Sequence, residues 1–329
     1  MAAISPLRRS LHSGVHADSH SPKKVASDRN ILRVVLGDLL FDTWYGSFYP
    51  EELVGGGKGE VDRLYVCSWC FRYSRELMPY LAHVKTCACR ERAPPGKCVY
   101  SRGPYSIYEV DGETDPLFCQ NLSLFAKLFL ENKSVCFDLS NFKYYLLAYT
   151  PPQPPNAPHR APQVIGLFSK EKMSWDNNNL ACILVFPPWQ RKGLGKILMG
   201  ISYELSKREG RLGGPEKPLS DLGRRSYLSF WSTTIARYIL SLPPRKPITI
   251  RFISKATFIL PEDILAALKD MNVLSPRKRG DAAAAVVSKH RVREWARLNR
   301  VDLRPIVEDA GFLEAWVPEA MNGDVDMSG

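Results

Sequence analysis

The chain has 329 residues, of which 45% are hydrophobic and 24% charged, and its formal net charge is +11. A chain of this length and composition can bury one large core with smaller satellites, and it contains no run near the roughly 20 apolar residues that a membrane span needs. These properties exclude a chain disordered throughout, predict a soluble intracellular protein with no membrane partner, and fit either acidic partners such as nucleosomes or an ordinary basic surface.

Residues 1–30 are rich in serine, histidine and basic side chains and hold little apolar surface. This composition predicts a disordered basic arm, and its first residues lack the apolar run of a secretory signal. An ordered N-terminal subdomain is expected over residues 31–100, beginning with a β-like apolar run from Ile31 to Leu40.

A metal-binding motif lies inside this subdomain. Cys67 and Cys70 stand two residues apart and precede His83 and Cys87, and these ligand types at this spacing are typical of a tetrahedral structural zinc site. Cys89 is an alternative fourth ligand that the spacing does not exclude. Four protein ligands leave no open position for a substrate, so the zinc ion is assigned to folding and not to catalysis.

A mixed α/β core is expected over residues 101–225. Apolar alternation predicts strands at Ser106–Val110, Lys143–Tyr149 and Val164–Phe168, with one helix at about Leu122–Asn132. Residues 151–162 contain six prolines in twelve positions, which excludes a helix or a central strand. This segment is therefore predicted to be an extended surface insertion, either a partner-binding loop or an inert spacer.

The clearest sequence unit is a buried strand, a glycine turn and a long helix. The strand is predicted at Leu180–Phe186, the turn at Gln190–Lys196, and the helix from Leu194 to a cap at Gly210. Free N–H groups at a helix N-terminus favour an anion, and glycines allow phosphate to approach the backbone closely. The turn lacks the Gly-Lys-Ser/Thr ending of a P-loop and the third glycine of a dinucleotide fingerprint, so its basic residues suit the pyrophosphate of coenzyme A better than ATP or NAD.

The last third of the chain is expected to be a helical subdomain, residues 226–316, followed by a flexible tail over residues 317–329. Its clearest helices are Pro261–Met271 and an amphipathic segment around Val292–Leu298. A basic stretch, Pro276–Arg279, interrupts them and offers a weak nuclear import signal.

Several longer motifs between Ile31 and Leu274 are specific enough to indicate a family resemblance. From Ile31 to about Leu274 the chain resembles the MYST family of histone acetyltransferases. The motifs that carry the resemblance are Asp42–Tyr45 with Tyr49–Glu52, the zinc knuckle, Pro94–Gly96, Tyr108–Gly112, Gln120–Leu122, Ala126–Leu130, Gly166–Lys172, Asn179–Leu184, Tyr203–Ser206 and Pro215–Gly223. The chain departs from the family in Trp189 and Leu194, where tyrosine is common, and in the proline-rich insertion.

The resemblance implies a fold, a reaction and a set of site residues. The expected fold is a central N-acetyltransferase-like (GNAT-like) core that binds acetyl-CoA, flanked by a zinc-finger subdomain and a C-terminal helix-turn-helix-like subdomain. By matching motifs, Glu216 is the general base, Cys182 the active-site cysteine and Lys127 the lysine that becomes acetylated. The residues expected to contact acetyl-CoA are Ile183, Leu184, Val185, Gln190, Arg191, Lys192, Gly193, Leu194, Gly195, Lys196, Ser220 and Ser229.

Small size makes the chain most similar to the short fungal silencing-type members of that family. This similarity implies a nuclear enzyme that acetylates the basic tail of histone H4 on the nucleosome, together with accessory subunits of a larger complex. Two alternatives stay open: an acetyltransferase for a non-histone lysine, and a chromatin-binding scaffold with a degenerate enzyme core. Intact Glu216, Cys182 and the complete glycine turn argue against the scaffold.

Overall fold

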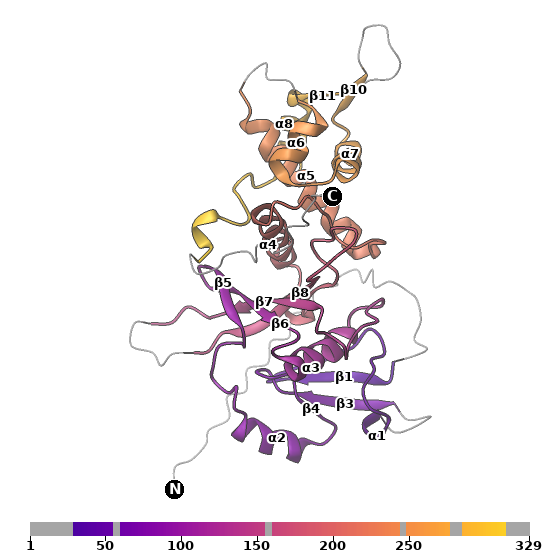
Figure 1. Ribbon diagram of the computed structural model, residues 1–329, viewed down its shortest axis with the longest axis vertical. Coiled ribbons are helices and arrows are strands. Elements are labelled where there is room, and N and C mark those ends of the chain that lie inside the picture. Colours follow the sequence, from indigo (N-terminus) through magenta and orange to yellow (C-terminus); the bar gives the residue numbers. More distant parts are fainter. Residues whose placement is uncertain (1–28, 55–59, 155–159, 244–247, 277–284, 314–329) are drawn as a thin grey trace, which may run out of the picture.

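A computed structural model describes residues 29–54, 60–154, 160–243, 248–276 and 285–313 (Figure 1). The predicted basic arm up to residue 28, the tail from residue 317, and Arg277 to Arg279 lie outside the described residues. Within the described ranges, no helix combines the length and the apolar character that crossing a membrane requires.

The N-terminal subdomain contains a four-stranded sheet of order β2-β1-β3-β4. Its elements are β1 (Ile31–Leu36), β2 (Leu39–Asp42), α1 (Glu51–Val54), β3 (Val61–Val66), β4 (Tyr73–Ser74) and α2 (Leu77–Thr86). The predicted single run from Ile31 to Leu40 is wrong in one respect, because Gly37 adopts a φ of 60° and folds the run into a β1–β2 hairpin.

The central sheet is antiparallel, with the order β5-β6-β7-β8-β9. Its strands are β5 (Lys97–Arg102), β6 (Tyr105–Asp111), β7 (Phe142–Tyr149), β8 (Gln163–Glu171) and β9 (Ile183–Val185). The three predicted strands are confirmed as β6, β7 and β8. The described part of the proline-rich insertion joins β7 to β8 without helix or strand, as predicted.

The helix of the central region begins and ends earlier than the sequence predicts. Helix α3 (Pro116–Lys127) starts at a proline, which fits the first turn because that position needs no N–H donor. Beyond Lys127 the chain continues in tighter turns, with Phe129 N donating to Ala126 O at 3.0 Å. The apolar residues that suggested a helix as far as Asn132 therefore lie partly in these turns, beyond the end of α3.

Two long helices follow the central sheet. After the short η1 (Pro187–Trp189), α4 (Leu194–Arg208) is confirmed, with Gly210 just beyond its end at a φ of 69°. Helix α5 (Asp221–Ser241) begins at Ser220, whose hydroxyl accepts a hydrogen bond from Gly223 N. This helix runs through the predicted boundary between residues 225 and 226, so it belongs to both subdomains.

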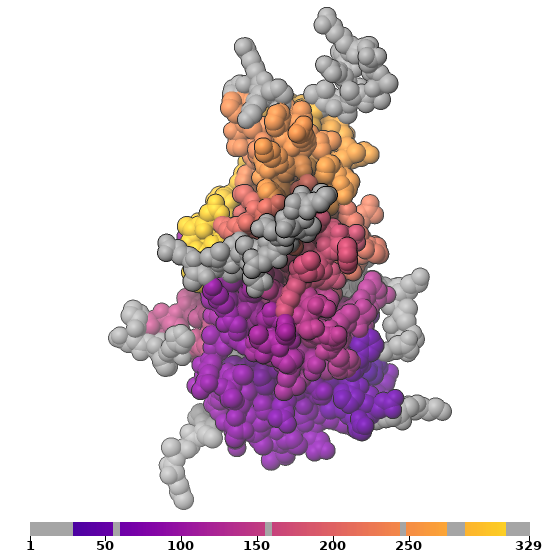
Figure 2. Space-filling model, in the orientation of Figure 1, coloured from indigo at the N-terminus to yellow at the C-terminus, as the bar shows by residue number. Residues whose placement is uncertain are grey.

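The C-terminal elements form a helical layer at the far end of the molecule from the first sheet (Figures 1 and 2). They are α6 (Ile250–Thr257), α7 (Pro261–Asp270), β10 (Leu274–Pro276), β11 (Ala285–Val287) and α8 (Lys289–Leu298), and the short η2 (Asp309–Gly311) follows them in the chain. The predicted helices at Pro261–Met271 and Val292–Leu298 are confirmed as α7 and α8.

The end of the described chain does not stay in this layer. Phe312 packs its ring against Tyr100 of β5 at 5.1 Å between centroids, and the η2 segment lies beside α4 and β5 (Figure 1). Residues 226–316 are therefore not one helical subdomain, because their last part covers the central sheet.

Three apolar clusters hold these layers together. One fills the space between the first sheet, α3 and the central sheet, a second lies between the central sheet and α4, and a third joins α4 to helices α5–α8. Strand β9 touches all three, because Leu184 faces the first cluster while Ile183 packs against the other two. The strand that precedes the glycine turn is thereby fixed from both sides.

Candidate active site and metal centre

The four predicted metal ligands converge in the N-terminal subdomain. Cys67 follows β3 and Cys70 lies in the next turn, while His83 stands on α2 and Cys87 caps its end. Their ligand atoms all lie within 4.8 Å of one another, with Cys67 Sγ 3.9 Å from Cys87 Sγ and Cys70 Sγ 3.2 Å from His83 Nε2.

This arrangement fits zinc. Sulfur atoms bound tetrahedrally at about 2.3 Å from zinc lie about 3.8 Å apart, which is close to the cysteine separation found here. The alternative ligand Cys89 is not part of the cluster. All four positions are protein ligands, so bound zinc would tie α2 to the end of β3 and would supply no catalytic position.

The glycine turn presents backbone and open space at the N-terminus of α4. Arg191 and Gly193 both adopt the left-handed region, with φ of 62° and 77°. A Cβ built on Gly193 or Gly195 would meet no atom within 4 Å. No protein neighbour therefore requires glycine at position 195, whereas a phosphate group approaching the backbone would.

The predicted contact at Leu194 concerns its backbone and not its side chain. The side chain of Leu194 is only 3% exposed and belongs to the cluster between the sheet and α4, so only its backbone can face a ligand. Arg191 and Lys192 are exposed, and Gln190 Nε2 donates to Val185 O at 2.8 Å, which joins the turn to β9. Ser220 and Ser229 are both exposed on α5 or at its N-cap.

Glu216 and Cys182 come together through backbone pairing. Glu216 N donates to Leu180 O at 2.8 Å, and Asn179 N donates to Gly214 O at 2.9 Å, so the Gly214–Glu216 segment runs beside the chain that leads to Cys182. The Glu216 carboxylate is one of the charges that act on the Cys182 thiol.

Both groups have pKa values shifted toward their protonated forms. Burial, and then the nearby charge of Glu171, raise the pKa of Glu216, although its side chain stays open to solvent on one side. Burial is also the main cause that raises the pKa of Cys182, partly offset by Lys133. Burial thus raises the pKa of both the Glu216 carboxyl group and the Cys182 thiol.

The lysine that is predicted to be modified lies close to two aromatic rings. Lys127 Nζ sits 5.9 Å from the ring centroid of Tyr45 and 5.6 Å from that of Phe48, and burial lowers its pKa. It donates hydrogen bonds to two carbonyl oxygens that follow α3. The charges that affect the pKa of Cys182 are those of Lys133 and Glu216, and not that of Lys127.

A second lysine, which the sequence reasoning did not single out, acts electrostatically on the thiol of Cys182. Lys133 is only 6% exposed, its Nζ stands 5.9 Å from the Tyr144 ring centroid, and its charge lowers the pKa of Cys182. In the sequence it follows Asn132 in a polar turn and looks like a surface lysine. Only its burial in the folded chain distinguishes it.

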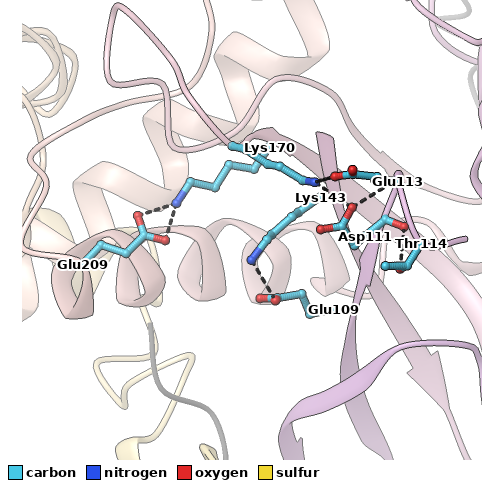
Figure 3. A network of polar contacts seen from close by, with 8 residues as sticks. Glu109, Asp111, Glu113, Thr114, Lys143, Lys170 and Glu209 are labelled. Carbon is cyan, nitrogen blue, oxygen red and sulfur yellow. Dashed lines mark hydrogen bonds and ion pairs between the residues drawn. The ribbon is translucent and has the colours of Figure 1, made fainter. Parts of the chain in front are cut away.

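Three lysines of strand β7, strand β8 and the residues that follow β8 form ion pairs with carboxylates other than Glu216. Lys143 binds Glu109, Lys170 binds Glu209 on α4, and Lys172 Nζ lies 2.8 Å from an oxygen of Asp111 (Figure 3). Within the described residues, the carboxylates of Glu171, Asp176 and Glu216 have no ion-pair partner. These three carboxylates thus make no salt bridge with the described residues, although Lys170 and Arg211 line the same small pocket as Glu171.

Comparisons with known proteins agree with these features. Residues 93–309 match the model of the MOZ/SAS family, and residues 28–87 match that of the MYST family zinc finger domain. The chain is 39% identical over 297 residues, 90% of its length, to histone acetyltransferase MOF of Drosophila melanogaster. It is 37% and 34% identical, over 80% and 89% of its length, to the histone acetyltransferase Tip60 homolog of Caenorhabditis elegans and histone acetyltransferase KAT6A of Homo sapiens.

The matched regions contain the features described above. The zinc finger match ends at Cys87 and so includes all four ligands, and the MOZ/SAS match includes β9, the glycine turn and Glu216. The chain spans 34%, 55% and 14% of the lengths of these three relatives. The MOZ/SAS match covers more than half of the chain, and together with these identities it shows that the chain belongs to the MOZ/SAS family and carries the zinc finger domain of the MYST family.

Proposed function

We propose that this chain transfers the acetyl group of acetyl-CoA to a lysine side chain of a histone or another basic chromatin protein. The observation that carries the proposal is the pairing of the Glu216 segment with the chain before Cys182, next to a glycine turn with open space at the start of α4. Acetyl-CoA supplies the activated acyl group, and the turn is suited to its pyrophosphate.

The reaction needs a base. A free lysine with a pKa near 10.4 is neutral about once in a few thousand molecules at pH 7, a penalty of roughly 4 to 5 kcal/mol for a nucleophilic amine. Glu216, directly or through a water molecule, accepts a proton from the attacking ammonium group. The neutral amine then attacks the thioester carbonyl carbon, and the N–C bond forms as the C–S bond breaks. The extra proton on the nitrogen passes to the leaving coenzyme A thiolate, directly or through water, and Glu216 returns its own proton to solvent.

Direct transfer is favoured over an acetyl-cysteine intermediate. A thiol attacks as its thiolate, and burial raises the pKa of Cys182 above that of a free cysteine. The proposed role of Cys182 is therefore to line the acyl site.

The surface beside Glu216 supports a basic acceptor. Glu171 acts electrostatically on Glu216, and Asp176 lies exposed on the connection that follows β8. On the same connection Trp175 is fully exposed, and an exposed tryptophan ring binds lysine or arginine through its face. A lysine flanked by other basic residues, as in the histone H4 tail, suits this surface. Action in the nucleus, a silencing-type role and accessory subunits belong to the same proposal.

The direct test measures transfer from labelled acetyl-CoA to histone H4 and H3 tail peptides by the purified chain. We expect transfer to H4 peptide, a loss of at least 100-fold in Glu216→Gln, in line with removal of a general base, and retained transfer in Cys182→Ala. Calorimetric titration with acetyl-CoA shows whether each variant still binds the donor.

Three other outcomes would change the conclusion. Absence of both transfer and acetyl-CoA binding, together with tight DNA binding, would favour the chromatin-binding scaffold. Transfer only to non-histone proteins would identify a different acceptor. Loss of activity in Cys182→Ala with an acetylated wild-type cysteine would overturn direct transfer.

A further inference from the structure

A buried carboxylate of the C-terminal layer contacts the segment that carries Glu216. Asp263, in the first turn of α7, is 5% exposed, and its Oδ1 accepts a hydrogen bond from Lys217 Nζ at 2.9 Å. Its other oxygen, Oδ2, is buried without a hydrogen-bond partner among the described residues. An ionised carboxylate at this depth is costly unless it is paired, so Lys217 is held strongly at this position.

The same aspartate meets the segment at a second point. A Cβ built on Gly214 would lie 3.0 Å from Leu260 Cδ1 and 3.2 Å from Asp263 Oδ2, so the backbone passes directly against the start of α7. On its other side the segment is hydrogen-bonded to Asn179 and Leu180. Residues 214–217 therefore lie between α7 and the segment that connects β8 to β9.

The neighbouring acid provides a contrast. Glu262 also approaches Lys217, but at 3.8 Å and with its side chain 60% exposed, compared with 6% for Asp263. An ion pair at such a distance between two exposed groups contributes little, whereas the pair at 2.9 Å is a charge-assisted hydrogen bond with one buried partner, Asp263, and with a Lys217 side chain that is 45% exposed. Of these two carboxylates, Asp263 is the one able to hold Lys217.

We propose that Asp263 is a positioning residue for the transfer reaction: through Lys217 and Gly214 it fixes the segment on which Glu216 stands, so that α7 sets the place of the proton acceptor. The inference rests on the proposed role of Glu216 as the base. A displacement of a reacting group by about 1 Å can lower a rate by as much as 100-fold. The C-terminal layer would thus act on chemistry that occurs at the edge of the central sheet.

The experiment uses the full zinc-loaded chain and compares Asp263→Asn, Lys217→Met and the double variant, with Glu262→Gln as the matched control and Lys217→Arg as the conservative variant. Initial rates are measured with histone H4 tail peptide over a range of acetyl-CoA concentrations. Thermal unfolding of each variant reports its stability.

We expect kcat to fall roughly tenfold or more in Asp263→Asn and in Lys217→Met, with KM for acetyl-CoA unchanged to within about twofold. The double variant should be no slower than Asp263→Asn alone, because both changes break one contact. Lys217→Arg should recover part of the rate, and Glu262→Gln should match the wild type.

A wild-type kcat in Lys217→Met, which breaks the pair from its exposed side, would overturn the inference even if Asp263→Asn failed to fold. Additive losses in the double variant, or an equal loss in Glu262→Gln, would also overturn it. A wild-type chain that transfers nothing would remove the proposed function and this inference with it, whereas an active wild type with a full-rate Asp263→Asn removes only the positioning role.

Discussion

At the scale of single residues, the site combines an accessible base with a protonated thiol. In its proposed role Glu216 meets a substrate amine; its side chain is exposed, and partial burial and then Glu171 raise the pKa of its carboxyl group. Cys182 lies deeper and its pKa is raised by burial first. One local environment thereby favours proton uptake by the carboxylate and a neutral state of the cysteine.

The pH dependence of transfer follows from this shift. A base works only when deprotonated, so the rate should be full above the raised pKa of Glu216 and should decline as the pH falls through it. The decline should begin at a higher pH than the ordinary glutamate value of about 4.3 implies. Rates measured from pH 5 to 9 test this, and Glu171→Gln, which removes a like charge, should move the decline to lower pH. A decline that stays in place would show that another group titrates.

The acetylation of a lysine inside the chain is a second prediction at this scale. Lys127 stays the residue that the family motif indicates, but Lys133 is the buried lysine whose charge reaches Cys182. Peptide mapping by mass spectrometry after incubation with acetyl-CoA separates the two sites. Acetylation in the wild type that disappears in Lys133→Arg and persists in Lys127→Arg would assign the modification to Lys133, and the reverse pattern would assign it to Lys127.

At the scale of elements, β9, the glycine turn and α4 form the unit that we propose binds the acetyl donor. The strand is fixed by apolar clusters on both of its faces, and α4 is fixed by its apolar stripe, which includes Leu198 and Ile201. The turn between them carries almost no packing at Gly193 and Gly195. A rigid frame around an open backbone loop is the arrangement that anion binding by N–H groups requires.

Gly195→Ala should separate stability from binding. Alanine is a better helix former than glycine by about 0.5–1 kcal/mol, and no neighbour opposes a Cβ at this position. We therefore expect equal or higher thermal stability together with acetyl-CoA binding weaker by about tenfold, which corresponds to about 1.4 kcal/mol. Thermal unfolding and calorimetry provide the two readings. Unchanged affinity would show that the donor phosphates do not approach Gly195.

At the scale of the whole molecule, the three layers are joined by segments distant in sequence. Helix α5 crosses from the central region into the C-terminal layer, α7 contacts the Glu216 segment, and the end of the described chain returns to β5. Arg208 of α4 strengthens this return, because its guanidinium lies 3.7 Å from the Phe312 ring centroid.

Because the end of the described chain packs against β5, a substitution of Gly311 should lower the stability of the protein. A Cβ at this position would lie 2.4 Å from a ring carbon of Tyr100, so Gly311→Ala must displace the ring or the chain. Such overpacking costs about 1–3 kcal/mol, which should appear as a lower midpoint in denaturant. Tyr100→Leu should abolish most of the additional cost in the double variant. Additive losses would mean that the two residues do not meet.

The sequence by itself determined the features that depend on short spacing: Cys67, Cys70 and His83 as metal ligands, the β9–turn–α4 unit, the central strands and α7. Cysteine pairs, glycine turns and apolar periodicity act over a few residues, so their consequences are visible in the chain. Only the tertiary structure decided that Cys87 and not Cys89 completes the ligand cluster, that Lys133 is buried and acts electrostatically on Cys182, that Asp263 contacts the Glu216 segment and that Phe312 returns to β5. Burial and contact between distant segments depend on how the layers pack, and no local pattern carries that information.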